Sequence, residues 1–132
     1  MCGFLCFVGC GMAFVSFEDL RVFQMAEKLS DDIWDIVGTW SFFEKDTIGK
    51  QLVRSADSIG ANIAEGSGRG SAKDNKRFVR IARGSLNETK FWIRRASNRG
   101  LLNAVHMKRL KKVVDELAPT LNAYLTSIGR KS

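Results

Sequence analysis

DTIGKQLVRSADSIGANIAE, residues 46–65, carries an apolar residue at every third or fourth position. This spacing matches the 3.6-residue turn of an α-helix and not the two-residue period of a β-strand. Gly60 costs about 1 kcal/mol relative to alanine inside a helix, so we expect a close helix–helix contact there to compensate. The expected inward positions are Ile48, Leu52, Ala56, Ile59 and Ile63.

The same period recurs in three other parts of the chain, at about residues 18–39, 71–98 and 103–128. Each stretch places its apolar residues on one face and therefore predicts an amphipathic helix. The expected inward positions are Leu20, Phe23, Leu29, Ile33, Ile36, Val37 and Trp40 in the first; Phe78, Ile81, Ala82, Ser85, Thr89, Trp92 and Ala96 in the third; and Leu110, Val113, Val114, Leu117, Leu121, Leu125 and Ile128 in the fourth.

Short connections separate these stretches. We expect a link at residues 41–45 and a glycine-rich turn, GSGRG, at residues 66–70. Gly66 is expected to be a left-handed helix cap, and Gly100 to end the third helix. Pro119 predicts a kink or break in the fourth helix. Four amphipathic helices joined by short loops predict an all-α fold, an antiparallel up-and-down four-helix bundle.

The first 17 residues carry no charged side chain. A signal peptide would have Lys or Arg near its start, and a membrane-spanning helix would have about 20 apolar residues, so both alternatives fit less well than a non-native extension. We expect an apolar leader at residues 1–16 that is either non-native or disordered, with Met12 as the natural start, and a bundle at residues 17–132. A membrane role is expected only if residues 1–17 are native.

The composition favours binding over catalysis. The single histidine, His106, has no partner, and the cysteines follow a C-x3-C-x3-C spacing that matches no common zinc pattern. The GSGRG turn lacks the Gly-Lys-Ser/Thr ending of a nucleotide-binding loop. Since no cysteine lies beyond residue 10, the fold suits a reducing cytoplasm. We expect a cytoplasmic protein that is not an enzyme and has no catalytic residues, metal or cofactor.

Positive charge is concentrated on the third predicted helix and the turn before it. The chain has a formal net charge of +7, whereas ten basic and two acidic residues give residues 69–99 a net charge of +8, so the rest sums to −1. Basic residues along one helix are typical of proteins that follow nucleic-acid phosphates. The alternative is a solvated face paired with Asp31, Asp32 and Asp35. The candidate nucleic-acid-binding residues are Arg69, Lys73, Lys76, Arg77, Arg80, Arg83, Lys90 and Arg94.

Three polar residues stand among apolar ones in the second and third helices. Asn62 and Glu65 flank Ile63, and Glu88 is expected to face them across the bundle. A structural ion pair or hydrogen bond between helices explains them better than an acid/base site, which needs a pocket and a second titrating group. The aromatic residues expected in the core are Phe23, Trp34, Trp40, Phe78 and Trp92.

Three segments together resemble a known bacterial family: FEDLRVF at residues 17–23, RSADSIGANIAEG at 54–66 followed by Gly68-Arg69, and RIARGSLNE at 80–88. This family of four-helix-bundle proteins includes proteins encoded in intervening sequences of 23S ribosomal RNA genes, and the resemblance covers about residues 17–128. It implies an antiparallel four-helix bundle that assembles into a ring-shaped homopentamer. The motif residues, for which we expect a structural role, are Asn62, Glu65, Gly66, Arg69, Arg83, Ser85 and Glu88.

The chain is also similar in fold to the accessory protein of diversity-generating retroelements, which binds a reverse transcriptase and nucleic acid. We therefore expect an oligomeric accessory protein that associates with nucleic acid, RNA before DNA, through its basic third helix. The alternative is a protein-interaction scaffold that binds a reverse transcriptase or another acidic protein partner.

Overall fold

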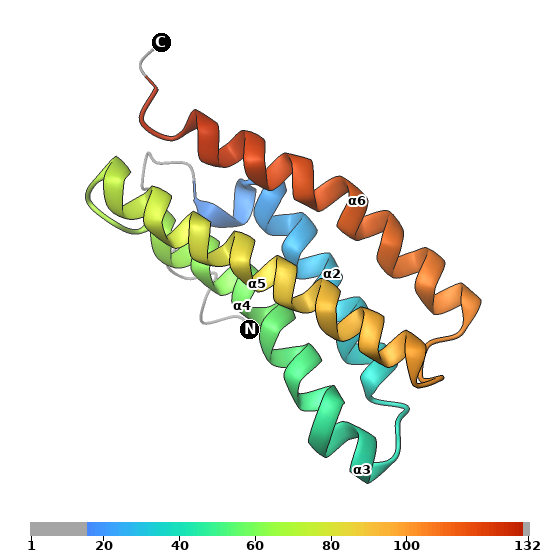
Figure 1. Cartoon of the computed structure of the whole chain (residues 1–132). Coiled ribbons are helices and arrows are strands. Elements are labelled where there is room, and N and C mark those ends of the chain that lie inside the picture. Colours follow the sequence, from blue (N-terminus) through green and yellow to red (C-terminus); the bar gives the residue numbers. More distant parts are fainter. Residues whose placement is uncertain (1–15, 131–132) are drawn as a thin grey trace.

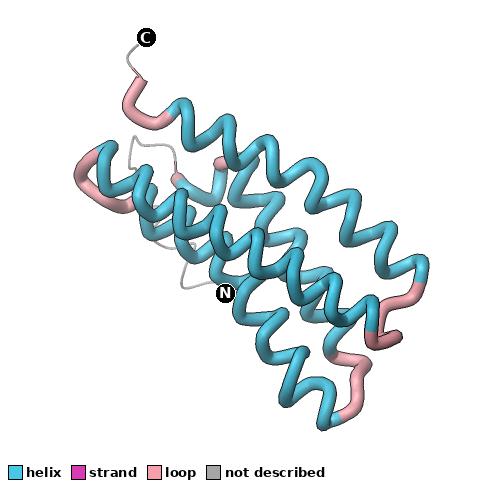
Figure 2. The backbone as a smooth tube through the Cα atoms, viewed as in Figure 1, coloured by secondary structure: helices cyan, strands magenta, loops and turns pink. Residues whose placement is uncertain are grey.

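Helices make up most of residues 16–130, the part of the chain that the computed structural model describes. These residues include no strand, and the four long helices pack side by side with alternating direction (Figures 1 and 2). The predicted all-α four-helix fold is therefore confirmed. The long helices are α2 (Arg21–Val37), α4 (Lys50–Ser67), α5 (Ala72–Asn98) and α6 (Ala104–Ser127); the short ones are η1 (Phe17–Asp19), α3 (Phe42–Glu44) and η2 (Lys45–Gly49).

Each long helix contacts two long neighbours, in the cyclic order α2, α4, α5, α6 and back to α2. Helix α2 therefore lies diagonally across the bundle from α5, and α4 lies diagonally across from α6. Within residues 16–130, no helix is long and apolar enough to cross a membrane. The predicted leader, its cysteines and the Met12 start lie outside the described residues, apart from Ser16 at the leader's end.

The predicted apolar stripes of α2, α4 and α6 point into the bundle. Gly60 is also buried and faces α2, but a Cβ at this position would lie 3.5 Å from Phe23 Cε1, an ordinary van der Waals distance, so the contact is no closer than alanine would allow. Val22 and Ala26 join the core in addition. The predicted residues found buried are Leu29, Ile33, Ile36, Val37, Trp40, Ile48, Leu52, Ala56, Ile59, Ile63, Leu110, Val114, Leu117, Leu121 and Ile128.

The predicted stripe of α5 is partly wrong. Ile81 is exposed, whereas Phe78, Ser85 and Trp92 are only half-buried. Helix α5 packs against α4 on one flank and α6 on the other, and both flanks carry apolar residues, so the sequence pattern alone does not identify the middle of the buried face. The residues of α5 that are buried are Val79, Ala82, Leu86, Thr89, Ile93 and Ala96.

The second helical stretch begins earlier than predicted, so residues 41–45 are not a loop. Ser41 caps α3: the Glu44 N–H donates to Ser41 Oγ at 3.3 Å, and the Ser41 N–H donates to Glu44 Oε1 at 3.0 Å. The chain then passes through a π-helical turn into α4. A Cβ on Gly49 would lie 2.8 Å from Val37 Cγ1, so this turn packs closely against α2.

Gly66 is not the predicted left-handed cap, and the predicted break at Pro119 does not occur. Gly66 lies inside α4 and is buried, whereas the glycines with positive φ in the described chain are Gly100 (75°) and Gly129 (81°). Gly100 thus ends α5 as predicted. Helix α6 continues through Pro119 without a break. Ser71 caps the N-terminus of α5, since the Asp74 N–H donates to Ser71 Oγ at 3.2 Å.

Candidate nucleic-acid interface

Six of the eight candidate residues lie along one side of α5 and make no ion pair within the described residues. They follow one another at steps of three, four or seven residues, which places their side chains on the same side of a helix. All are exposed except the half-buried Lys76, and none makes an ion pair within residues 16–130. The line spans about 32 Å at 1.5 Å per residue. We call it the basic strip: Lys73, Lys76, Arg80, Arg83, Lys90 and Arg94.

The other two candidates, Arg69 and Arg77, are held by their own neighbours. Arg69 Nη2 lies 3.0 Å from Glu65 Oε2, and its guanidinium sits 4.7 Å from the centre of the Phe78 ring. Arg77 contacts the same ring at 4.5 Å, and its Nε lies 3.8 Å from Asp74 Oδ1. These two arginines pack around Phe78 at the α4–α5 turn and carry less free charge than the basic strip.

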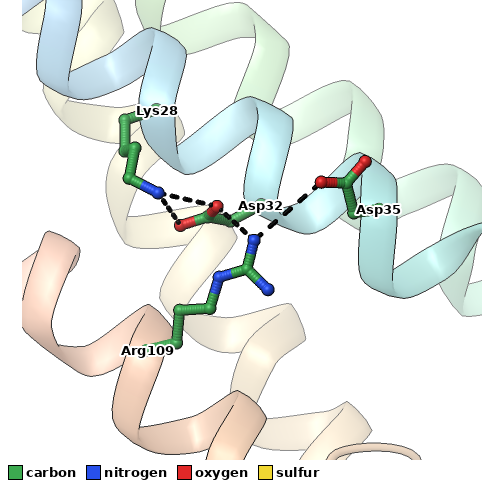
Figure 3. Close-up of polar contacts among 4 residues, drawn as sticks. All are labelled: Lys28, Asp32, Asp35 and Arg109. Atoms are coloured by element: carbon green, nitrogen blue, oxygen red, sulfur yellow. Dashed lines mark hydrogen bonds and ion pairs between the residues drawn. The ribbon is translucent and has the colours of Figure 1, made fainter.

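The acidic residues of α2 do not pair with α5, so the ion pairs expected in the alternative do not form. Asp32 is 2% exposed and accepts from Lys28 Nζ at 3.0 Å and from Arg109 Nη2 of α6 at 2.7 Å (Figure 3). Asp35 also lies near Arg109, at 3.9 Å, and Asp31 makes no ion pair within the described residues. The reason is the diagonal placement of α2 and α5, which leaves the basic strip open.

A groove of about 550 Å³ runs between the strip and α6. Lys90 and Arg94 line it from α5, and Lys111 lines it from α6, where its Nζ lies 2.7 Å from Asp115 Oδ2. Further along, Arg83 Nη1 donates to Asn122 Oδ1 at 3.4 Å. The strip therefore flanks a concave surface with basic side chains on both walls, and such surfaces concentrate anions.

The predicted polar network of Asn62, Glu65 and Glu88 does not form. Glu65 and Glu88 are exposed; Glu65 pairs with Arg69, while Glu88 Oε2 accepts from Trp92 Nε1 at 3.1 Å. Neither carboxylate faces the other across the bundle, because both side chains point out of the α4–α5 contact.

Hydroxyl groups take the place of that network. Ser58 Oγ and Ser85 Oγ lie 2.9 Å apart, and Asn62 Nδ2 donates to Ser58 Oγ at 3.0 Å. One turn further, Thr89 Oγ1 donates to Ser55 Oγ at 3.1 Å. Of the motif residues, Asn62 and Ser85 thus lie in the α4–α5 contact, as does the buried Gly66.

Some of these features had signals in the sequence. Asp32 stands three residues after Leu29 and four before Ile36, which is the spacing of the buried stripe itself. Ser41 and Glu44 form the S-x-x-E pattern of a capping box. In the hydroxyl pairs, Ser85 and Thr89 were among the residues predicted to face inward, whereas Ser55 and Ser58 of α4 were not.

The expected aromatic core is wrong at Trp34. This side chain is 65% exposed, and Phe42 and Phe43 nearby in the sequence are 82% and 73% exposed. Trp40 is buried, and Phe23, Phe78 and Trp92 are half-buried. No group of three or more His, Cys, Asp or Glu within residues 16–130 is placed to hold a metal ion.

Comparison with known proteins supports the sequence resemblance. The family model described as 23S rRNA-intervening sequence protein matches residues 18–123. No curated protein matches the chain by sequence. A similar solved structure is a 1.70 Å crystal structure of a protein with unknown function from the S23 ribosomal protein family, from Bacteroides thetaiotaomicron VPI-5482. The TM-score is 0.71 at 22% identity, covering 80% of this chain and 99% of that chain, which shows a shared fold.

Proposed function

This chain belongs to the 23S rRNA-intervening sequence protein family, and from that membership and its surface charge we propose that it is a non-enzymatic accessory protein that associates with RNA along α5. The observation that carries the proposal is the basic strip, whose six cations make no ion pair within the described residues. The family name connects the protein with ribosomal RNA and favours RNA over DNA.

The strip suits phosphate binding without sequence readout. Lysine and arginine on a rigid helix neutralise successive phosphates, and the released counterions drive association. The exposed aromatic residues Trp34, Phe42 and Phe43 belong to α2 and α3, away from the strip in the sequence and on other helices. On α5 itself, Phe91 is 51% exposed and directly follows Lys90, so an aromatic side chain beside the strip is accessible for stacking.

Salt titration with a charge-reversed variant tests the proposal. Replacing Lys76, Arg80 and Arg94 by glutamate removes three phosphate contacts, and each contact contributes about −0.9 to the log–log salt slope on a duplex and about −0.7 on a single strand. We expect the slope to become shallower by about 2 to 3 and the affinity near 0.1 M salt to fall by about 100-fold or more.

A matched control carries the same change in net charge on other helices. It replaces Lys45, Lys50 and Arg54 by glutamate, and these three are exposed residues of η2 and α4. We expect this control to keep most of the wild-type affinity and slope. Equal losses in both variants would show attraction by net charge alone and would refute binding along α5, as would RNA binding that ignores salt.

The second candidate function is a protein-interaction scaffold that self-associates. Phe42 and Phe43, adjacent in the chain and 82% and 73% exposed, support it together with the 65% exposed Trp34, because exposed large apolar side chains are common at protein–protein contacts. The resemblance implies a homopentamer. Light scattering of wild type and a Phe42→Ser/Phe43→Ser variant tests the role of these residues: we expect an oligomer that dissociates in the variant, and an identical mass for both would contradict it.

The two candidates also make different predictions in cell extract. If the basic strip binds an acidic protein such as a reverse transcriptase, capture of that partner survives nuclease treatment. If the strip binds RNA, nuclease treatment removes the captured material, and the captured nucleic acid is degraded by ribonuclease.

A further inference from the structure

A second groove, between α2 and α6, carries an unusual set of charges. Its volume is about 380 Å³, and it lies on the opposite side of α6 from the groove beside the basic strip. Four cations and two carboxylates line it, so the net charge of its lining is +2. These residues are Arg21, Lys28, Asp32, Arg109, Lys112 and Glu116.

The buried carboxylate of Asp32 positions two of these cations. Its side chain is 3% exposed, and Lys28 Nζ and Arg109 Nη2 approach it from α2 and α6 at 3.0 Å and 2.7 Å (Figure 3). Lys28 and Arg109 remain 61% and 43% exposed, so each still presents N–H groups to the groove. A buried ion pair seldom adds net stability over an apolar contact, so fold stability alone does not explain Asp32.

The other two cations, Arg21 and Lys112, make a long ion pair or none within the described residues. Arg21 Nη2 lies 3.8 Å from Glu116 Oε2, a long and exposed contact, and Lys112 makes no ion pair within residues 16–130. Two lining carboxylates thus face four cations, and Asp35, which is not part of the lining, lies 3.9 Å from Arg109 Nη2, so the excess is one positive charge when Asp35 is counted. A concave surface with an excess of one charge focuses its field and attracts an ion of the opposite sign.

We propose that the α2–α6 groove binds a phosphate monoester dianion, separately from RNA binding on α5. A monoester carries nearly two negative charges at neutral pH and three terminal oxygens, which matches the charge excess and the converging N–H donors. A phosphodiester, the group of an RNA backbone, carries one charge and two blocked oxygens. The groove therefore selects a terminal phosphate, whether on a free nucleotide, on the end of an RNA, or as inorganic phosphate.

Titration with two small probes tests this selectivity. Methyl phosphate represents the monoester and dimethyl phosphate the diester, and binding is followed by calorimetry at pH 7.5 and constant ionic strength. We expect methyl phosphate to bind at least tenfold more tightly. At pH 5 its affinity falls, because the second pKa of a phosphate monoester is about 6 and the dianion becomes protonated.

Two neighbouring lysines on α6 provide a matched pair of variants. Lys112 lines the α2–α6 groove, whereas Lys111 lines the α5–α6 groove, and both are exposed. We expect Lys112→Gln to weaken methyl phosphate binding at least fivefold and Lys111→Gln to leave it unchanged. Asp32→Asn is less suitable because it alters a buried group, so Arg21→Gln, at a 73% exposed side chain, is the second test variant and should weaken binding similarly.

The outcomes separate the proposal from nonspecific attraction. Equal binding of methyl and dimethyl phosphate, equal effects of the Lys112 and Lys111 variants, or no binding up to tens of millimolar would each overturn it. A nucleoside 5′-monophosphate that binds more tightly than methyl phosphate would support the proposal and identify a nucleotide or RNA end as the source. Equal binding of the two would support the phosphate group alone as the ligand.

Discussion

Gly66 allows the closest contact between α4 and α5, and replacing it by alanine should separate the two helices. A Cβ on Gly66 would lie 2.6 Å from Asn75 Oδ1, 2.9 Å from Phe78 Cβ and 3.0 Å from the Asn75 carbonyl oxygen. The amide of Asn75 can rotate, but the other two atoms belong to the backbone and first side-chain carbon of α5. They can move only if the helix itself moves.

The expected cost follows from two opposing terms. Overpacking costs about 1–3 kcal/mol, and the upper half of this range, about 2–3 kcal/mol, applies here because two of the three atoms can move only with the helix. Alanine recovers about 1 kcal/mol because it has a higher helix propensity than glycine. We therefore expect Gly66→Ala to lower the free energy of unfolding by about 1–2 kcal/mol, and the midpoint temperature by about 5 °C for a domain of this size.

Gly84 provides the matched control. It lies within the same helix pair, in the middle of α5, but a Cβ there would meet nothing within 4 Å. Gly84→Ala should therefore raise the free energy of unfolding by about 0.5–1 kcal/mol. Both variants are measured by urea unfolding at equal protein concentration, since self-association makes stability concentration-dependent. A Gly66→Ala variant as stable as wild type, or more stable, would refute the close α4–α5 contact.

Three other substitutions test particular contacts by the same unfolding assay. Glu88→Ala should change stability by less than about 0.5 kcal/mol, because the side chain is exposed, and a loss of several degrees would restore the buried-network interpretation. Thr89→Val should cost about 1 kcal/mol, because it removes the hydrogen bond to Ser55 Oγ; no loss, alone or with Ser55→Ala, would contradict that role. Pro119→Ala should add about 1–3 kcal/mol, because alanine is the better helix residue at this exposed interior position, and a less stable variant would argue against the continuous helix.

The helical period of the sequence predicted the buried residues correctly in helices that have a single apolar face. Along η2 and α4, the stripe from Ile48 to Ile63 is buried as predicted, because polar residues occupy most of the remaining faces. In α5, Ile81 and Val79 belong to two adjacent apolar lines, and packing against both α4 and α6 decides which line is buried. Tertiary packing supplies this choice, and a single sequence does not contain it.

The candidate interface was predictable in position but not in detail. The concentration of charge on residues 69–99 is a property of the sequence alone. Which charges are free depends on the helix order, because the diagonal placement of α2 directs Asp32 to Arg109 instead of α5. The stacking of Arg69 and Arg77 on Phe78 likewise depends on the folded turn between α4 and α5.

The most direct test of the central claim maps where RNA touches the protein. A short RNA containing 4-thiouridine is bound at low salt and cross-linked by light, and the modified peptides are identified by mass spectrometry. We predict cross-links in peptides from α5 and the facing side of α6, lost at high salt and in the Lys76, Arg80 and Arg94 charge-reversed variant. Cross-links confined to α2 and α4, or none under conditions where a known RNA-binding protein reacts, would contradict RNA association along α5.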